Sequence, residues 1–282
     1  MLEEDSRVAV VLAEISDARL RAIAQPYADR IFNVGIREQL MIGVAAGLAM
    51  SGMIPIAHSY ASFLVDRTYE QIKLDLTHQN VPAVLVSIGG SYDASHEGRT
   101  HQSPGDVALF DTIGGWRVDV PGHPDEVEPL LRRAVAAGGR TYIRLSARSN
   151  AHPTALQEHW QIIGQGTRAT VVAVGPLLDL VVEATRSLDV TVLHAITVRP
   201  FDHGTLTATL RSPSIVIVEP YLAGTSSVFL ERALMNAPHR CLSLGVGSQE
   251  LRSYGTGLDH ERVHGIDAEG IRRSIMQFLS LA

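Results

Sequence analysis

Side chains suited to acid–base chemistry gather in three segments of the sequence. Glu38 stands just inside the start of a strongly patterned helix, after Gly35, which lets the backbone bend and a ligand approach closely. A carboxylate there can exchange protons with a ligand, but the same position also suits a surface carboxylate that caps a helix. The other candidates follow predicted strands, where α/β folds place their ligands: His58, Tyr60, Asp93, His96, Glu97 and His101.

Apolar strands that alternate with helices must position these side chains. Such continuous strands are typical of a parallel sheet covered on both faces, so the fold class is α/β, with two parallel-type sandwich domains. We expect one domain over residues 1–150, a linker over 151–164 and a second domain over 165–282. Predicted strands are 8–12, 31–34, 53–57, 82–88, 117–120, 141–145, 170–174, 190–193, 214–218 and 241–244.

Predicted helices fill the intervals between these strands. In the helix that begins near Glu38, apolar residues recur at the spacing of one helical face, which should pack on a core, while Glu38 falls off that face. The residues of that face are Ile36, Leu40, Met41, Val44, Ala45, Leu48 and Ala49. Further helices are predicted over 60–79, 124–137, 176–187, 202–211 and 225–237, and from about 267.

Composition excludes several classes of protein. The chain has 282 residues and a net charge of -6, and it lacks a basic cluster with interleaved aromatics, so we expect no nucleic-acid partner. No apolar run is long enough to span a membrane, and the acidic start is unlike a signal peptide, so we expect a cytoplasmic protein. The single cysteine, Cys241, excludes an internal disulfide and is expected to be buried in a strand.

Common catalytic fingerprints are also missing. The sequence has no P-loop, no zinc-ligand spacing, no dinucleotide fingerprint and no Gly-x-Ser-x-Gly elbow. We therefore expect no metal site within this chain.

Three ordered blocks resemble the transketolase family of thiamine diphosphate enzymes, which includes the deoxyxylulose-phosphate synthases. They are Phe32-Asn-Val-Gly-Ile-Arg-Glu-Gln39, then Tyr60-Ala-Ser-Phe-Leu64 with Arg67-Thr-Tyr-Glu-Gln71, and Glu97-Gly-Arg-Thr-His-Gln102 followed by Asp106. The resemblance implies a pyrimidine-binding domain followed by the transketolase C-terminal domain.

The family's diphosphate-binding domain, with its Gly-Asp-Gly motif, is expected before residue 1 and is not in the sequence. The resemblance therefore implies the C-terminal subunit of a split transketolase, in an α2β2 assembly. A separate N-terminal subunit would bind the diphosphate and Mg2+ or Ca2+. The expected activity is transfer of a two-carbon ketol unit from a ketose donor to an aldehyde acceptor.

The resemblance also implies roles for single residues. Glu38 would share a proton with N1′ of the coenzyme pyrimidine and so activate it. Phe63 and Tyr60 match the aromatic positions that stack on that ring. Arg67 resembles an arginine after the aromatic block, with Val65 and Asp66 making the spacing one residue longer than usual.

The loop after residue 88 would contact the substrate. His101 matches the histidine that contacts substrate hydroxyls and moves protons. Glu97 stands where the family usually has aspartate, which changes the reach of the carboxylate, and Arg99 replaces the usual proline and adds a charge to the pocket rim. His58 is either a further ligand or a packed histidine at the end of a strand.

The family's phosphate clamp is not matched. Gly89 and Gly90 occupy the region of its first cation, and Ala147 stands where an arginine is usual, with Arg148 one residue later. We therefore expect an unphosphorylated or unusual sugar-like substrate.

Three other functions remain open. The same layout occurs in β subunits of 2-oxoacid dehydrogenases, which decarboxylate an oxoacid and pass on an acyl group. A non-catalytic subunit that stabilises a thiamine enzyme is the second, although Glu38 and His101 argue against it. The third is a plain α/β binding module, which would bind a ligand alone.

Overall fold

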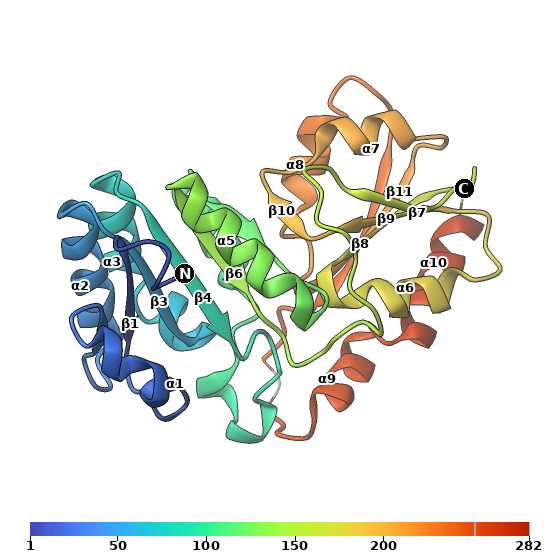
Figure 1. Cartoon of the computed structure of the whole chain (residues 1–282). Helices are drawn as coiled ribbons and strands as arrows, with labels where there is room; N and C mark the ends of the chain where they lie inside the picture. Colours follow the sequence, from blue (N-terminus) through green and yellow to red (C-terminus); the bar gives the residue numbers. More distant parts are fainter. Residues whose placement is uncertain (251, 282) are drawn as a thin grey trace.

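The structure is a computed structural model, and it describes residues 1–250 and 252–281. Two mostly parallel sheets, each with helices packed on it, lie side by side (Figure 1). The fold class predicted from the apolar strands is confirmed.

The first sheet has seven strands within the described residues, in the order β10-β5-β6-β4-β3-β1-β2. All its neighbouring strands are parallel except β10, which pairs antiparallel with β5. Its part of the chain contains β1 (Val8–Leu12), α1 (Asp17–Ala24), β2 (Ile31–Asn33), α2 (Glu38–Met50), β3 (Ile54–Tyr60), α3 (Tyr69–Gln71), β4 (Ala83–Ile88), α4 (Asp106–Ile113), β5 (Arg117–Asp119), α5 (Val127–Ala137) and β6 (Arg140–Arg144).

The second sheet has five strands within the same described residues, in the order β12-β11-β8-β9-β7, and β7 runs antiparallel to β9. Its part of the chain contains β7 (Gln161–Gly164), β8 (Thr170–Val174), α6 (Leu178–Thr185), β9 (Thr191–Ala195), β10 (Thr197–Arg199), α7 (His203–Thr209), β11 (Ser214–Leu222), α8 (Ser227–Ala233), β12 (Arg240–Val246), α9 (Gly257–His264) and α10 (Ala268–Ser280). β10 leaves this part of the chain to complete the first sheet.

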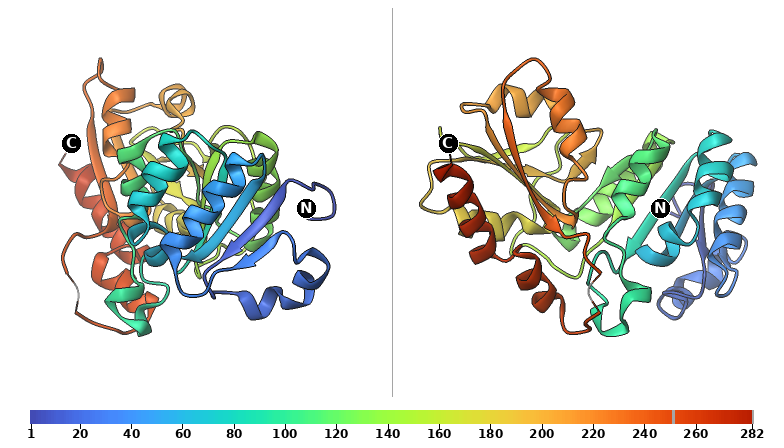
Figure 2. Two further views of the ribbon diagram at one scale, coloured as in Figure 1. Left: turned by 90° about the vertical axis from the view of Figure 1, so that its left-hand side faces the viewer. Right: turned by 180° about the vertical axis from the view of Figure 1, so that it is seen from behind.

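Helices cover both faces of each sheet. Figure 2 shows α2 and α3 on the outer face of the first sheet, with α5 on the face toward the second sheet. In the second sheet α6 and α10 pack together on one face, and α7 and α8 on the other. A single apolar cluster runs from the α2 side of the first sheet to the second sheet, with Phe110, Trp116 and Tyr221 among its members. The two sheets therefore share a core.

The buried face of α2 differs from the predicted one. Glu38 itself is buried, whereas Ile36 and Leu40 are 73% and 47% exposed. The apolar residues of this helix extend around more than one side, so their spacing alone did not identify the packed side. The buried residues of α2 are Glu38, Met41, Ile42, Ala45, Ala46 and Ala49.

Several other boundaries also differ from the predictions. β3 continues to Tyr60, where a helix was expected to begin, and the helical segment after it consists of π-helical turns at 62–66 and 72–78 around the short α3. The last residues of the expected linker, Gln161–Gly164, form β7. The pattern did not predict α1, α4, α9 or β10.

Candidate functional site

The turn before α2 buries the carboxylate of Glu38. Asn33 Oδ1 accepts hydrogen bonds from the backbone N–H groups of Gly35 (3.0 Å) and Glu14 (3.1 Å), and Gly35 has a φ of +72° that favours glycine. Glu38 is the first residue of α2, where unpaired backbone N–H groups favour a negative charge. Only 2% of it is exposed, so Glu38 does not serve as a surface cap.

Arg67 connects Glu38 to aromatic side chains. Its Nη1 donates to Glu38 Oε2 at 2.7 Å, and its guanidinium carbon lies 4.2 Å from the centroid of the Phe63 ring. Gln39 donates to the Arg67 carbonyl at 3.3 Å. The Arg67 side chain is 39% exposed, so the ion pair is buried on the carboxylate side and open to solvent on the arginine side.

A π-helical turn absorbs the extra residue before Arg67. Ser62–Asp66 is π-helical, and the Arg67 N–H donates to the Ser62 carbonyl, five residues earlier, at 3.1 Å. Such a turn takes one residue more than an α-helical turn and keeps the backbone hydrogen-bonded. The longer spacing therefore still brings Arg67 to Phe63 and Glu38.

Tyr60, Phe63 and His101 form what we call the aromatic group. Their ring centroids lie 5.9 Å apart for Tyr60 and Phe63, 5.4 Å for Tyr60 and His101, and 4.8 Å for Phe63 and His101, all edge to face. At Gly89, with φ +67°, a Cβ atom would lie 2.3 Å from the Tyr60 ring, so only glycine allows this approach. Residues from β3, the π turn and the loop after β4 thus meet at one place.

Glu97 and Arg99 form their contacts outside the aromatic group. The Glu97 side chain is 52% exposed and lies 3.5 Å from His96 Nε2. Arg99 Nε donates to Glu250 Oε2 at 3.1 Å, and its Nη1 donates to the Gln102 carbonyl at 2.8 Å. Neither contacts the aromatic group directly.

His58 has partners of its own within the fold. Its Nδ1 donates to the Val86 carbonyl at 2.9 Å, so the neutral ring accepts from the Ser16 hydroxyl at Nε2, also at 2.9 Å. Burial lowers the pKa of His58 from its ordinary 6.5. Both ring nitrogens are engaged, and the structure does not bring His58 into contact with the aromatic group.

A fully buried ion pair supports the loop after β4. Arg144 Nε donates to Asp106 Oδ2 at 2.7 Å, and the Tyr142 hydroxyl donates to the same oxygen at 2.7 Å. Arg144 Nη2 reaches Ser91 Oγ at 2.7 Å. A Cβ at Gly90 would lie 2.7 Å from the guanidinium, so the glycine makes room for it. The motifs in the sequence included Asp106 and Gly90, but they did not predict that Arg144 contacts both.

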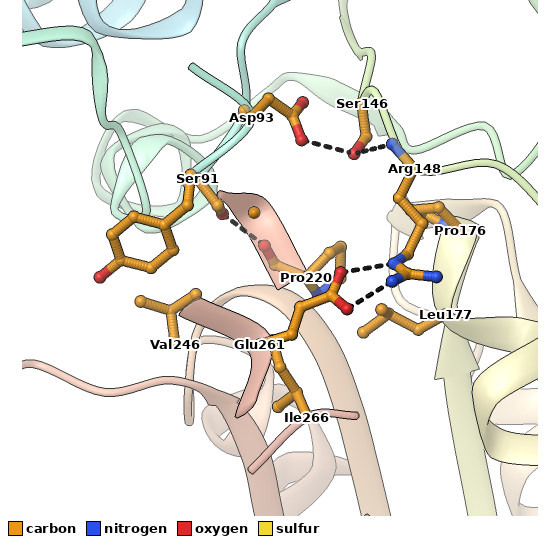
Figure 3. Close-up of a pocket in the computed structure, with 13 residues that line it drawn as sticks. Ser91, Asp93, Ser146, Arg148, Pro176, Leu177, Pro220, Val246, Glu261 and Ile266 are labelled. Atoms are coloured by element: carbon orange, nitrogen blue, oxygen red, sulfur yellow. Dashed lines mark hydrogen bonds and ion pairs between the residues drawn. The ribbon is translucent and has the colours of Figure 1, made fainter. Parts of the chain in front are cut away.

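A pocket lies between the two sheets (Figure 3). Asp93 accepts from Ser146 Oγ at 3.1 Å and from the Ala147 N–H at 2.9 Å, while burial raises the pKa of its carboxyl group. Arg148, the displaced arginine of the sequence, forms a two-point ion pair with Glu261. Its charge is therefore neutralised from within the chain.

Asp66 is a polar residue that the motifs did not single out. It accepts from Ser103 Oγ at 2.9 Å and borders a cavity of about 460 Å³ that Arg99 and Glu250 also line. Packing around the carboxyl group raises the pKa of Asp66 to about 6, and the charge of Asp106 adds to the rise. The only sequence signal was the longer spacing of the aromatic block, in which Asp66 lies.

Among residues 1–250 and 252–281, no three His, Cys, Asp or Glu side chains are arranged to hold a metal ion. In the same described part of the chain, no helix is long and apolar enough to cross a membrane.

Comparison with known proteins places the chain in a family. Residues 1–152 match the family model for the transketolase pyrimidine binding domain. The chain is 50% identical over 283 residues to an uncharacterized 33.6 kDa protein in the fasciation locus of Rhodococcoides fascians, with 99% of this chain and 91% of that protein aligned. It is 27% identical over 278 residues to one of the subunits of the apulose-4-phosphate transketolase of Actinobacillus succinogenes, covering 94% of this chain and 89% of that one. It is 28% identical over 289 residues to 1-deoxy-D-xylulose-5-phosphate synthase of Thermotoga petrophila, covering 98% and 47%.

Solved structures show the same fold. A structure described as a split gene transketolase, inactive beta4 tetramer, matches with a TM-score of 0.86 at 23% identity and covers 99% of this chain and 94% of that one. Transketolase from Leishmania mexicana matches with a TM-score of 0.76 at 18% identity, over 98% and 43%. The chain belongs to the transketolase family of thiamine diphosphate-dependent enzymes, with its pyrimidine-binding domain in residues 1–152.

Proposed function

We propose that this chain is the pyrimidine-binding subunit of a split transketolase that transfers a two-carbon ketol unit from a ketose to an aldehyde. The observation that carries the proposal is the buried carboxylate of Glu38, which Arg67 joins to the aromatic group. An acid beside flat apolar faces and a histidine is the set of side chains that the aminopyrimidine of thiamine diphosphate and a polyhydroxylated substrate need together.

The residues present fit the coenzyme's pyrimidine ring. Glu38 offers a carboxyl group shielded from water, and Phe63 and Tyr60 offer ring faces beside it. When bound, thiamine diphosphate supplies the electron sink for the two-carbon unit. Glu38 holds a proton at the pyrimidine nitrogen, and Phe63 and Tyr60 orient the ring and exclude water.

Arg67 and His101 have separate duties in this proposal. Arg67 balances the charge of Glu38, and it must leave the Phe63 face if the pyrimidine is to stack there. The Thr100 hydroxyl lies 3.0 Å from His101 Nδ1, and Nε2 has no hydrogen-bond partner among the described residues. His101 Nε2 is thus available for a substrate hydroxyl and for proton transfer.

The outer face of α2 supports the need for a partner subunit. Leu40 and Met50 are 47% and 56% exposed, and nothing lies within 4 Å of a Cβ built at Gly43 or Gly47. An apolar face with small residues lets another chain pack closely along the helix that begins at Glu38. We propose that a subunit carrying the diphosphate and Mg2+ site packs here, in an α2β2 assembly within the cytoplasm.

The printed names of two similar proteins support a separate partner subunit. One is named as a subunit of a transketolase, and one solved structure is an inactive tetramer of β chains from a split gene. We propose that this chain alone is likewise inactive and binds little coenzyme.

The test is reconstitution with a candidate partner that contains a diphosphate-binding domain. We expect ketol transfer by the pair and none by either chain alone. Glu38→Gln keeps the size of the side chain but removes the transferable proton, so we expect turnover to fall by at least about 100-fold. The exposed Glu70 serves as a matched control, and Glu70→Gln should leave turnover unchanged. Full activity of Glu38→Gln would refute the assignment.

The same assembly separates the rival functions. Release of CO2 from pyruvate without ketol transfer would select the 2-oxoacid dehydrogenase β subunit. A non-catalytic role would be selected if Glu38→Gln and His101→Asn both kept full activity in the complex.

We further propose that the substrate carries no phosphate ester. Three arginines in or beside the loop after β4 are each paired with a carboxylate: Arg99 with Glu250, Arg144 with Asp106 and Arg148 with Glu261. Assays with paired free and phosphorylated ketoses test this proposal. A preference for the phosphate esters would overturn it.

A further inference from the structure

The loop that carries His101 is attached to the second half of the chain. Loop 89–103 leaves β4 and contacts residues within 247–250 and 252–264, which include α9 and lie beside the loop in Figures 1 and 2. Ser95 Oγ donates to the Gly255 carbonyl at 2.9 Å. At Gly98, with φ +77°, a Cβ would lie 2.8 Å from the Tyr254 ring. The loop is therefore shaped by residues outside the pyrimidine-binding domain.

The most extensive of these contacts is a stack of three rings. Tyr92 lies parallel to His260, with ring centroids 4.1 Å apart and an interplanar angle of 11°, and to His264, at 5.1 Å and 14°. The Tyr92 hydroxyl also lies 3.0 Å from His264 Nε2. His260 and His264 are four residues apart on α9, so they lie on the same helical face. We call Tyr92, His260 and His264 the ring clamp.

The hydrogen bonds of the clamp fix the protonation of His264. The Gly247 N–H donates to His264 Nδ1 at 3.1 Å, so this nitrogen carries no proton and Nε2 donates to Tyr92. The His264 ring is therefore neutral in this arrangement. His260 Nε2 donates to the Tyr254 carbonyl at 2.6 Å, and His260 is 2% exposed.

We propose that His264 is a positioning residue for the transfer reaction, because it holds Tyr92 and thereby fixes the loop that presents His101 to the substrate. This inference rests on the proposed function of His101. The loop has little apolar anchoring of its own between Ser95 and His101, where exposed polar residues predominate. Its order must therefore come from contacts such as the ring clamp.

Acid should weaken the clamp. Burial and the neighbouring His260 lower the pKa of His264 from its ordinary 6.5, so the neutral ring is stable at neutral pH. Protonation of Nδ1 would break the bond from Gly247, which helps to hold the ring in place, while Nε2 would still donate to Tyr92. Other ionisable groups also act on the clamp. The charges of the Arg99–Glu250 pair act on Tyr92 from the loop and from the segment before α9, and the charge of Asp259 interacts with His260 on α9 itself.

Two substitutions test the clamp without disrupting the core. His264→Asn keeps an acceptor near Nδ1 for Gly247 but loses the bond to Tyr92, and Tyr92→Phe keeps the ring and removes only the hydroxyl. In hydrogen exchange of the full chain, we expect amides 95–102 to exchange about tenfold faster in both variants, while β8 is unchanged. Because both changes remove the same bond, the double variant should add little to either one. The exposed His152, changed to asparagine, is the matched control.

In the reconstituted complex, the same variants should lower kcat/KM about tenfold, because kcat falls and the KM for the substrate rises. The affinity for the coenzyme should be unchanged. In wild type, loop protection should fall as pH drops below 6.5, and this dependence should disappear in His264→Asn. Unchanged loop exchange in both variants would overturn the proposal, and so would faster exchange with unaltered kinetics. If the wild-type complex shows no ketol transfer, the proposed function fails, and the exchange data still decide whether His264 holds the loop.

Discussion

The change Asp106→Asn should strongly destabilise the protein. Asparagine keeps an oxygen that Tyr142 and Arg144 can bond, so the substitution removes the charge and little else. Arg144 and Asp106 are 1% and 0% exposed, and the guanidinium would be left buried without its counterion. Breaking a buried pair in this way costs about 3–5 kcal/mol of unfolding free energy. That is a large part of the roughly 5–15 kcal/mol typical of a folded protein.

Urea unfolding followed by circular dichroism measures this loss. The surface change Asp125→Asn is a control, expected to stay within about 0.5 kcal/mol of wild type. Arg144→Met alone should also be costly, but the double variant Asp106→Asn with Arg144→Met should lose less than the sum, because no buried charge remains. The reasoning would be refuted if Asp106→Asn cost less than about 1 kcal/mol, or if the two single losses were additive.

Three further outcomes are expected. Gly89→Ala would place a Cβ 2.3 Å from the Tyr60 ring at a φ of +67°, so it should lower the urea midpoint by the equivalent of about 1–3 kcal/mol, whereas Gly47→Ala, with open space around it, should not lower it. Burial raises the pKa of Glu219 from 4.5 to about 7, so the unfolded chain loses this proton at a lower pH than the folded chain does. The free energy of unfolding should therefore fall by up to about 3 kcal/mol as the pH rises from 4.5 to 7. In thermal scans Glu219→Gln should remove that slope, and an unchanged slope would contradict the shift. Burial also raises the pKa of Cys241 to about 11, so its alkylation at pH 8 should be on the order of 100-fold slower than in the urea-unfolded chain; equal rates would contradict it.

The strands were the most predictable part of the fold. Runs such as 8–12 and 171–174 are apolar throughout because helices cover both faces of the sheet. β3 was predicted to end too early because His58 and Ser59 are polar. His58 nevertheless pairs with residues in both β1 and β4, and Ser59 pairs with a residue in β4, which a single strand's sequence does not reveal.

The missed elements depend on tertiary contacts. β10 has three residues, and its partner β5 lies about 80 residues earlier in the chain. α9 is mostly polar, and its place in the fold follows from His260 and its neighbours packing on the loop after β4. Short or polar segments of this kind carry no periodic signal.

The candidate site was predictable by type but not by contact. The sequence indicated Glu38, Tyr60, Phe63 and His101, and the structure brings the last three together with Glu38 joined through Arg67. The sequence did not predict that Arg67 would bridge Glu38 and the aromatic group, because helical spacing changes when a π turn intervenes. Glu97, Arg99 and His58 were chosen by the same motifs, yet their partners in the fold lie elsewhere.

β10 belongs to the second half of the chain but pairs in the first sheet, and this affects how the chain can fold during synthesis. Buried Asp119 in β5 accepts from the hydroxyl of Thr197 at 2.7 Å, so the first sheet acquires its last strand only after residue 199 has left the ribosome. By then β8 and β9 of the second sheet have already emerged. The first sheet is therefore completed only after part of the second has emerged, and a fragment cut at residue 150 would expose the edge of β5 to pairing with other chains.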